Sequence, residues 1–235
     1  MQLERILQKQ GFGTRKECRA LCRDGRVEVN GQSCDEPLTD FACGGLVLTV
    51  DGVDWPYAEF ATVMLHKPAG YECSRKPLHH PGVLSLLPPP LRQRGVQPVG
   101  RLDEDTTGLL LITDDGQLNH RLSSGKRKVP KVYRAMTRHP VEQEQVERLL
   151  AGVVLNDDPE PVAAVACEIA EPRQLRLTLT SGKYHQVKRM VAAAGNRVEA
   201  LHREALGGLS LPDDLKPGEW RWLAAVDFEK LGMSR

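Results

Sequence analysis

Hydrophobic positions in the first 30 residues are spaced first as in helices and then as in a strand. Apolar residues recur at helical spacing over residues 3–7, and Gly11-Phe12-Gly13 ends that pattern. Thr14-Arg15-Lys16-Glu17 has the form of a capping box and predicts a second helix starting at Thr14. Residues 26–29 alternate between polar and apolar, and Asn30-Gly31 is typical of a two-residue hairpin turn because both residues tolerate positive φ. We therefore predict two short helices followed by a hairpin.

The pattern changes again before residue 60. A strand is predicted at Leu46–Val50, and a linker is predicted near Asp54–Phe60 because Trp55-Pro56 interrupts regular structure. These elements define a first domain over residues 1–60.

From Ala61 onward, short apolar runs alternate with helical patterns. The run at Leu109–Thr113 is continuous, as in a strand buried on both faces, whereas Gln174–Thr180 has leucines on one face and polar residues on the other. Pro88–Pro90 predicts a loop. Strands are also predicted at Val63–Leu65 and Lys131–Met136, and helices at Val141–Leu150 and His185–Ala194. We predict an α+β fold, with a mixed, mainly antiparallel sheet in a second domain over residues 61–235.

Composition narrows the class of protein. Hydrophobic residues make up 40% of the chain and charged residues 27%, which excludes a disordered, collagen-like or disulfide-scaffold chain. No apolar run approaches the roughly 18 residues of a membrane span, and the chain opens on an amphipathic stretch. We expect a cytoplasmic protein without a membrane partner, whose six cysteines stay reduced and serve in packing.

The net charge of +1 conceals an uneven distribution. Residues 1–34, 61–138 and 175–210 are basic, and acidic segments separate them. If the fold gathers the basic segments on one face, they form a path for a polyanion such as RNA. The alternative is solvated surface charge.

The first domain is similar to a known RNA-binding module. Its capped basic helix, the segment Gly25–Gly31 and the short strands resemble the alpha-L module first known from a small-subunit ribosomal protein. In that family the second helix and the following turn lie on RNA phosphates. The resemblance makes five residues candidate RNA contacts: Arg15, Lys16, Arg19, Arg23 and Arg26. The alternative is an amphipathic surface helix.

The loop Gly100–Gly108 is a candidate catalytic site. It contains Arg101, Asp103 and further acidic and hydroxyl side chains, and it directly precedes an apolar strand. A nearby guanidinium holds a carboxylate ionised, and an ionised carboxylate can act as a nucleophile. Taken alone, Arg101 and Asp103 favour a structural ion pair over a catalytic site.

Three further segments change that interpretation, because they occur along the chain in the order found in a known enzyme family. With the Gly-Arg-Leu-Asp loop, they resemble the signature of the pseudouridine synthases. Met64–Tyr71 is similar to the strand and Lys-Pro-x-Gly turn that opens the catalytic domain of that family, although His66 stands where Asn is common. Lys131–Tyr133 resembles the strand that carries the active-site tyrosine, and Gly182–Met190 resembles the motif that carries a basic partner of the catalytic aspartate.

The resemblance implies a reaction that uses no cofactor and no metal, in which uracil is detached from its ribose, turned, and rejoined through carbon. It implies that Asp103 attacks or assists at the sugar and that Lys188 keeps Asp103 charged. Arg101 would pair with phosphate or help to flip the nucleotide, and Tyr133 would pack on the extruded base and help to remove a proton from it.

Further segments are Asp105–Gly108, Thr113–Gln117, His185–Met190 and Leu201–Glu204 with Gly207-Gly208. They resemble the RsuA-type branch of the family, which modifies small-subunit (16S) ribosomal RNA. The implied partner is that RNA or an assembly intermediate, and we expect the protein to act as a monomer. The basic segment Lys126, Arg127 and Lys128 suits phosphate contacts before the Tyr133 strand. A synthase acting on large-subunit RNA is the alternative.

Other functions fit the sequence less well. Asp103-x-Asp105-x-Thr107 has the form of an aspartyl nucleophile loop of Mg-dependent phosphotransferases, but there the apolar strand precedes the first aspartate. A binding-only protein with an inactive synthase domain is disfavoured because every expected active-site position holds a competent residue. A cysteine metal site is disfavoured because no Cys-x-x-Cys pair occurs.

Overall fold

The computed structural model describes residues 1–74, 76–156 and 158–233, and they form two compact units. Unit 1 comprises Met1–Ala61 together with Leu84–Gln97, and unit 2 comprises Thr62–Val83 and Pro98–Arg235. The segment 84–97, which sequence analysis assigned to the second domain, therefore lies with the first unit.

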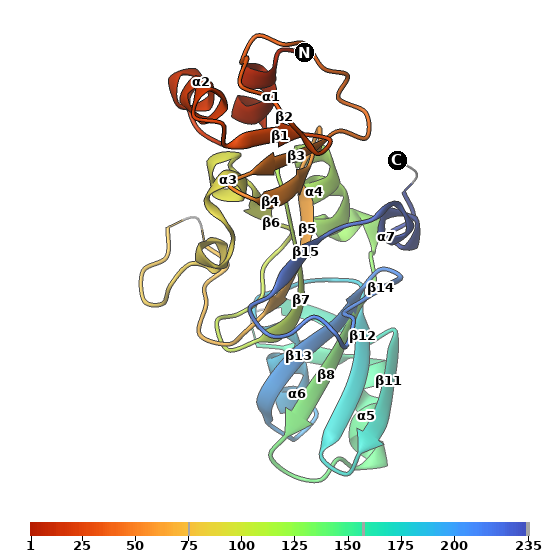
Figure 1. Cartoon of the computed structure of the whole chain (residues 1–235). Coiled ribbons are helices and arrows are strands. Elements are labelled where there is room, and N and C mark those ends of the chain that lie inside the picture. The colour runs from red at the N-terminus through yellow and green to blue at the C-terminus, as the bar shows by residue number, and fades with distance from the viewer. Residues whose placement is uncertain (75, 157, 234–235) are drawn as a thin grey trace. The chain divides into compact units, whose positions relative to one another are not determined.

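Unit 1 is built from short helices and a small antiparallel sheet with strand order β2-β1-β3-β4 (Figure 1). Thr14 and Glu17 form the predicted capping box, and Asn30 and Gly31 adopt positive φ in the predicted hairpin. Its elements are α1 (Leu3–Lys9), α2 (Arg15–Arg23), β1 (Val27–Val29), β2 (Gln32–Ser33), β3 (Val47–Val50), β4 (Val53–Pro56) and α3 (Pro89–Gln93), with the 3-10 helix η1 (Val83–Leu86) at the junction of the units.

Two proline-based predictions were wrong. Trp55 and Pro56 belong to β4 and do not interrupt regular structure; β4 is an edge strand, where a residue without an N–H is tolerated. Pro89 and Pro90 begin α3 instead of lying in a loop, because the first turn of a helix needs no N–H donors.

Unit 2 contains a mixed sheet with strand order β11-β12-β8-β13-β7-β5-β15. Neighbouring strands in this order pair antiparallel, except β13 and β7, which run parallel. Its elements are β5 (Thr62–Lys67), β6 (Gln97–Pro98, at the junction), β7 (Thr107–Thr113), α4 (Gly116–Ser123), η2 (Gly125–Arg127), β8 (Lys131–Thr137), α5 (Gln143–Ala151), β9 (Val153–Leu155), β10 (Asp158–Val162), β11 (Ala166–Glu171), β12 (Gln174–Leu179), α6 (Gln186–Ala193), β13 (Val198–Leu206), β14 (Leu209–Ser210), β15 (Trp220–Trp222) and α7 (Ala225–Lys230). The predicted mixed, mainly antiparallel α+β architecture is confirmed.

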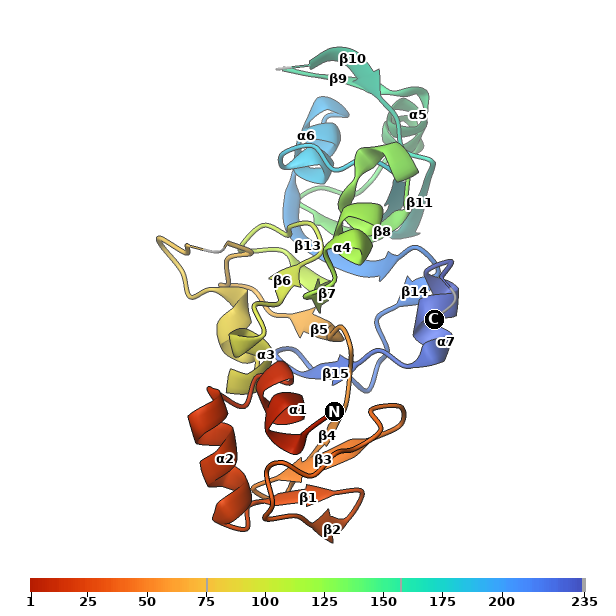
Figure 2. The same cartoon turned by 90° about the horizontal axis from the view of Figure 1, so that it is seen from above.

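Helices α5 and α6 cover one face of the β11, β12, β8 and β13 region (Figures 1 and 2). Tyr133 and Leu177 are buried on this face, whereas Arg134 and Arg176 on the other face are exposed. A further core holds Leu109 and Leu111 of β7 against α4 and α7. Helix α4 was not predicted from the sequence; it begins after Asp115, whose carboxylate accepts hydrogen bonds from the amides of Gln117 and Leu118.

The parallel pairing of β7 with β13 requires a glycine. Gly108 has a φ of +107°, and a Cβ at this position would lie 2.3 Å from the carbonyl oxygen of Arg203. Only a residue without a side chain allows this close approach. The pairing places β13 beside the strand that follows the Asp103 loop.

Candidate active site

Asp103 lies in the loop between β6 and β7, and a buried lysine holds the backbone of that loop. Lys67, at the end of β5, is fully buried and its Nζ donates to the carbonyl oxygens of Pro68 (3.1 Å), Glu104 (2.9 Å) and Thr106 (2.8 Å). Burial lowers the pKa of Lys67, while the surrounding thiol and carboxylates oppose that change. The Lys-Pro-x-Gly turn thereby positions the acidic loop, a role the sequence analysis did not assign to Lys67.

The carboxylate of Asp103 is paired with a cation from a distant part of the chain. Lys188, in α6, places its Nζ 3.4 Å from Asp103 Oδ2. The same Nζ donates shorter hydrogen bonds to Asp105, at 2.7 and 2.8 Å. One ammonium therefore pairs with two carboxylates, of which only Asp103 was predicted from the sequence as a partner of Lys188.

Lys188 remains charged in this setting. Its burial alone would lower its pKa, but the hydrogen bond to Asp105 and the charges of Asp103 and Asp105 outweigh that effect and raise the pKa above its ordinary value. A permanently cationic group thus stands beside the Asp103 carboxylate at neutral pH.

Asp103, Arg101 and Tyr133 line the same cavity. Tyr133 is only 9% exposed, the side chain of Asp103 is 28% exposed, and Arg101 is exposed. A carboxylate, an aromatic ring and a guanidinium therefore line one accessible space.

The structure adds two residues to this site. His185, just before α6, has its Nε2 3.5 Å from Asp103 Oδ1. Gln186 is buried, accepts a hydrogen bond from the amide of Lys183 (2.8 Å) and donates to Ser181 Oγ (2.7 Å). Both residues lie in the Gly182–Met190 motif, so the sequence motif could have identified them as candidates. Their position relative to Asp103 could not be predicted from the motif.

The candidate RNA contacts of unit 1 fall into two groups. Arg15, Lys16 and Arg23 are exposed on α2. Arg19 forms an ion pair with the buried Glu4, and Arg26 binds Asp51 through two hydrogen bonds of 2.6 and 2.8 Å. The hydrogen bond from Arg19 lowers the pKa of Glu4. Arg19 and Arg26 thus have partners within the unit.

The third basic segment lies in unit 2. Lys126 and Arg127 are in η2, Lys128 follows it with a φ of +49°, and all three side chains are exposed. They are not among the residues that line the cavity of Asp103.

Within residues 1–74, 76–156 and 158–233, no cluster of three or more His, Cys, Asp or Glu side chains is arranged to hold a metal ion. Over the same residues, none of the helices combines the length and apolar character that a membrane crossing requires.

Two parts of the chain match known protein families. Residues 61–193 match the RNA pseudouridylate synthase family, and residues 1–37 match the S4 domain. A Vibrio parahaemolyticus protein named ribosomal small subunit pseudouridine synthase A is 36% identical over 238 residues, which cover 98% of this chain and 99% of the relative. The Escherichia coli K12 protein of that name is 46% identical over 165 residues, which cover 70% of this chain and 71% of the relative.

A solved structure agrees with this relationship. A crystal structure described as that of a pseudouridylate synthase is 33% identical in sequence and has a TM-score of 0.70. The match covers 98% of this chain and 99% of the chain in that crystal structure. The chain therefore belongs to the RNA pseudouridylate synthase family and carries an S4 domain at its N-terminus.

Proposed function

We propose that this protein converts a uridine of small-subunit ribosomal RNA to pseudouridine, with Asp103 as the reacting carboxylate. The observation that carries the chemistry concerns the Asp103 carboxylate: it lies 3.4 Å from the Lys188 ammonium, and Asp103 lines a cavity together with Tyr133. The names of the curated relatives support the choice of RNA, and a ribosomal substrate implies work in the cytoplasm.

The reaction requires a nucleotide outside its base stack, because a stacked base cannot present its glycosidic bond to a carboxylate. In the proposed pose the Tyr133 ring packs on the extruded uracil, and Arg101 at the exposed rim pairs with phosphate. The bond between ribose C1′ and N1 breaks with the help of Asp103, the uracil turns, and a bond forms between C1′ and C5. The proton on C5 is then lost and N1 gains one, so the overall change is an isomerisation.

RNA binding is assigned in the same proposal to the exposed cations of α2 and to Lys126, Arg127 and Lys128. The acidic residue of α2 is Glu17, and its carboxylate accepts hydrogen bonds from Thr14. The helix therefore carries an excess of positive charge at Arg15, Lys16 and Arg23. Such cations bind phosphates and release counterions.

The identity of the RNA is tested by mapping pseudouridines in ribosomal RNA from cells with and without the gene for this protein. We expect one site in small-subunit RNA to be lost in the deletion strain. Loss of a site in large-subunit RNA instead, with all small-subunit sites retained, would contradict the proposed substrate.

The role of Asp103 is tested by Asp103→Asn, which removes the charge and keeps the shape. We expect pseudouridine formation to be abolished, and RNA affinity to change less than about threefold because phosphate contacts remain. Asp214→Asn is the matched control, because the Asp214 side chain is 82% exposed and pairs with Arg221 only at 4.0 Å. Turnover by Asp103→Asn at the rate of this control would remove Asp103 from the mechanism.

A further inference from the structure

A second, larger cavity shares part of its lining with the cavity of Asp103. The inner cavity, which contains Tyr133, has a volume of about 80 Å³, and the outer cavity has about 410 Å³. Arg101, Asp103 and His185 line both, whereas Tyr184 lines only the outer one. Asp103 therefore belongs to the walls of both cavities.

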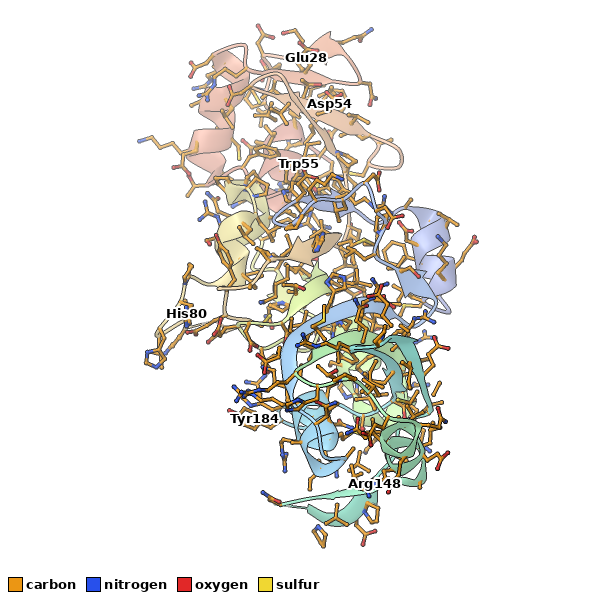
Figure 3. The ribbon with its side chains drawn as sticks, turned by 90° about the horizontal axis from the view of Figure 1, so that it is seen from below. Glu28, Asp54, Trp55, His80, Arg148 and Tyr184 are labelled. Atoms are coloured by element: carbon orange, nitrogen blue, oxygen red, sulfur yellow. The ribbon has the colours of Figure 1, made fainter. Side chains whose placement is uncertain are left out.

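Tyr184 presents an aromatic ring to solvent beside the reacting carboxylate. It is 69% exposed and lies in the segment that leads into α6 (Figure 3). Its ring is stacked on that of His185, with centroids 3.8 Å apart and planes inclined by 20°. One face of the Tyr184 ring is therefore covered by His185, and the exposure of the residue leaves the other accessible.

The position of this ring is tied to Asp103. His185 has a φ of +47°, a conformation that is uncommon for residues other than glycine, and its Nε2 lies 3.5 Å from Asp103 Oδ1. The backbone oxygen of Tyr184 also accepts a hydrogen bond of 3.1 Å from Arg189. The stack of two rings is thus held at a defined place relative to the carboxylate.

We propose that Tyr184 stacks on the base of a nucleotide adjacent to the target uridine and that the outer cavity is the subsite for that nucleotide. This inference rests on the proposed function. With the target base on Tyr133 in the inner cavity, the chain of the RNA leaves through the outer cavity, whose wall carries Arg101 and Lys183 for the connecting phosphate. An aromatic ring offered to any base suits this position because every base has a π-face.

The test uses kcat/KM for pseudouridine formation, measured by tritium release from 5-tritiated uridine. The substrate is small-subunit RNA joined by splinted ligation, so that a single nucleotide beside the mapped uridine can be made abasic. We expect Tyr184→Ala to reduce kcat/KM about 10-fold, as loss of a base stack does, and Tyr184→Phe to keep the wild-type value because the ring and not the hydroxyl is used.

The abasic substrate separates stacking from a structural role. An abasic nucleotide on one side of the target is expected to cost the wild-type protein about 10-fold in kcat/KM and to cost Tyr184→Ala nothing further. The inference would be overturned if Tyr184→Ala reduced kcat/KM, relative to wild type, by the same factor on abasic RNA as on intact RNA. The ring would then act without the neighbouring base. A loss in Tyr184→Phe equal to that in Tyr184→Ala would also overturn it.

Failure of the inference and failure of the proposed function are distinguishable. A wild-type protein that forms no pseudouridine in this RNA contradicts the proposed function and the inference with it. A wild-type protein that is active, with Tyr184→Ala equally active and folded to the same melting temperature, contradicts the inference alone.

Discussion

Lys67 carries its charge in the interior of unit 2, where its ammonium donates to three backbone carbonyls. Two of these carbonyls, those of Glu104 and Thr106, belong to the loop that holds Asp103. A buried carbonyl that loses its donor retains its full desolvation penalty, so the lysine is needed to keep the loop in this conformation.

We expect Lys67→Met, which keeps the length of the side chain but removes its charge and donors, to lower the free energy of unfolding by about 2 kcal/mol or more. Pseudouridine formation should fall about 100-fold, because small displacements of a reacting group are costly. Urea denaturation and the tritium-release assay measure the two effects.

Lys9→Met is the matched control for this substitution. Lys9 pairs with Glu59 at the surface of unit 1, where an ion pair contributes less than about 1 kcal/mol. A Lys67→Met variant as stable and active as Lys9→Met would show that the three carbonyls do not need their donor.

His202 makes stability depend on pH. Burial lowers its pKa below the ordinary value of 6.5, and the neighbouring His66, whose ring lies 5.6 Å away, lowers it further. Its Nδ1 is hydrogen-bonded to Thr107 Oγ1 at 2.8 Å. Since the unfolded chain takes up this proton at a higher pH than the folded protein, the contribution of His202 is present above pH 6.5 and is lost as the pH falls through the folded value.

We therefore expect the free energy of unfolding to decrease between pH 7.5 and pH 5.5, and to decrease less in His202→Gln. Denaturant titrations at the two pH values provide the measurement. The exposed His120 supplies the control variant His120→Gln, which should follow the wild-type protein. A pH dependence in His202→Gln as steep as in wild type would assign the effect to another group.

At the scale of elements, α2 has a buried face that packs in unit 1 and an exposed face that carries cations. Cys18 and Cys22 are buried, whereas Arg15, Lys16 and Arg23 are exposed. Arg19 belongs with the fold, because its removal would leave the buried carboxylate of Glu4 without its cation.

We expect the combined substitution of Arg15, Lys16 and Arg23 by Ala to weaken RNA binding. The slope of log affinity against log salt concentration should decrease by about 2, because each phosphate contact releases counterions. Binding titrations over a range of salt concentrations measure this slope.

The control is a second triple substitution to Ala, at the exposed cations Arg138, Arg197 and Lys216 of unit 2. It should leave the slope almost unchanged. Equal slopes in the two triple variants would show that α2 is not a specific RNA contact.

At the scale of the whole molecule, the chain leaves unit 2 and returns to it. Residues 84–97 lie with unit 1, where Arg94 donates hydrogen bonds to Gln10 (2.7 Å), Ala58 (3.0 Å) and Glu59 (3.1 Å). Leu91 in this segment is fully buried. Unit 1 is therefore completed by residues that come from within the second predicted domain.

A chain that starts at Thr62 lacks the rest of unit 1, so we expect it to expose the apolar residues of 84–97. We expect it to melt at a lower temperature than a second chain, which also starts at Thr62 but has a Gly-Ser linker in place of 84–97. Binding of a hydrophobic dye and thermal melting measure the difference. Identical melting and dye binding in the two chains would show that the segment does not depend on unit 1.

Local features were predictable because they depend on neighbours in the chain. The capping box at Thr14, the Asn30-Gly31 turn and the buried run Leu109–Thr113 require only short-range sterics, hydrogen bonds and apolar content. The motifs around Asp103, Tyr133 and Lys188 could be recognised for the same reason. The edge strand β4 was missed because the tolerance of Pro56 depends on its place in a sheet.

The amino-acid sequence by itself thus determined the class of fold, the likeness to the synthases and the candidate residues for the chemistry. Only the tertiary structure decided which side chains meet: Lys188 with both Asp103 and Asp105, His185 with Asp103, and Lys67 with the loop carbonyls. The physical reason is that hydrogen bonds and ion pairs act over a few ångströms. The distances between residues far apart in sequence are set by strand pairing and helix packing, which no local pattern contains.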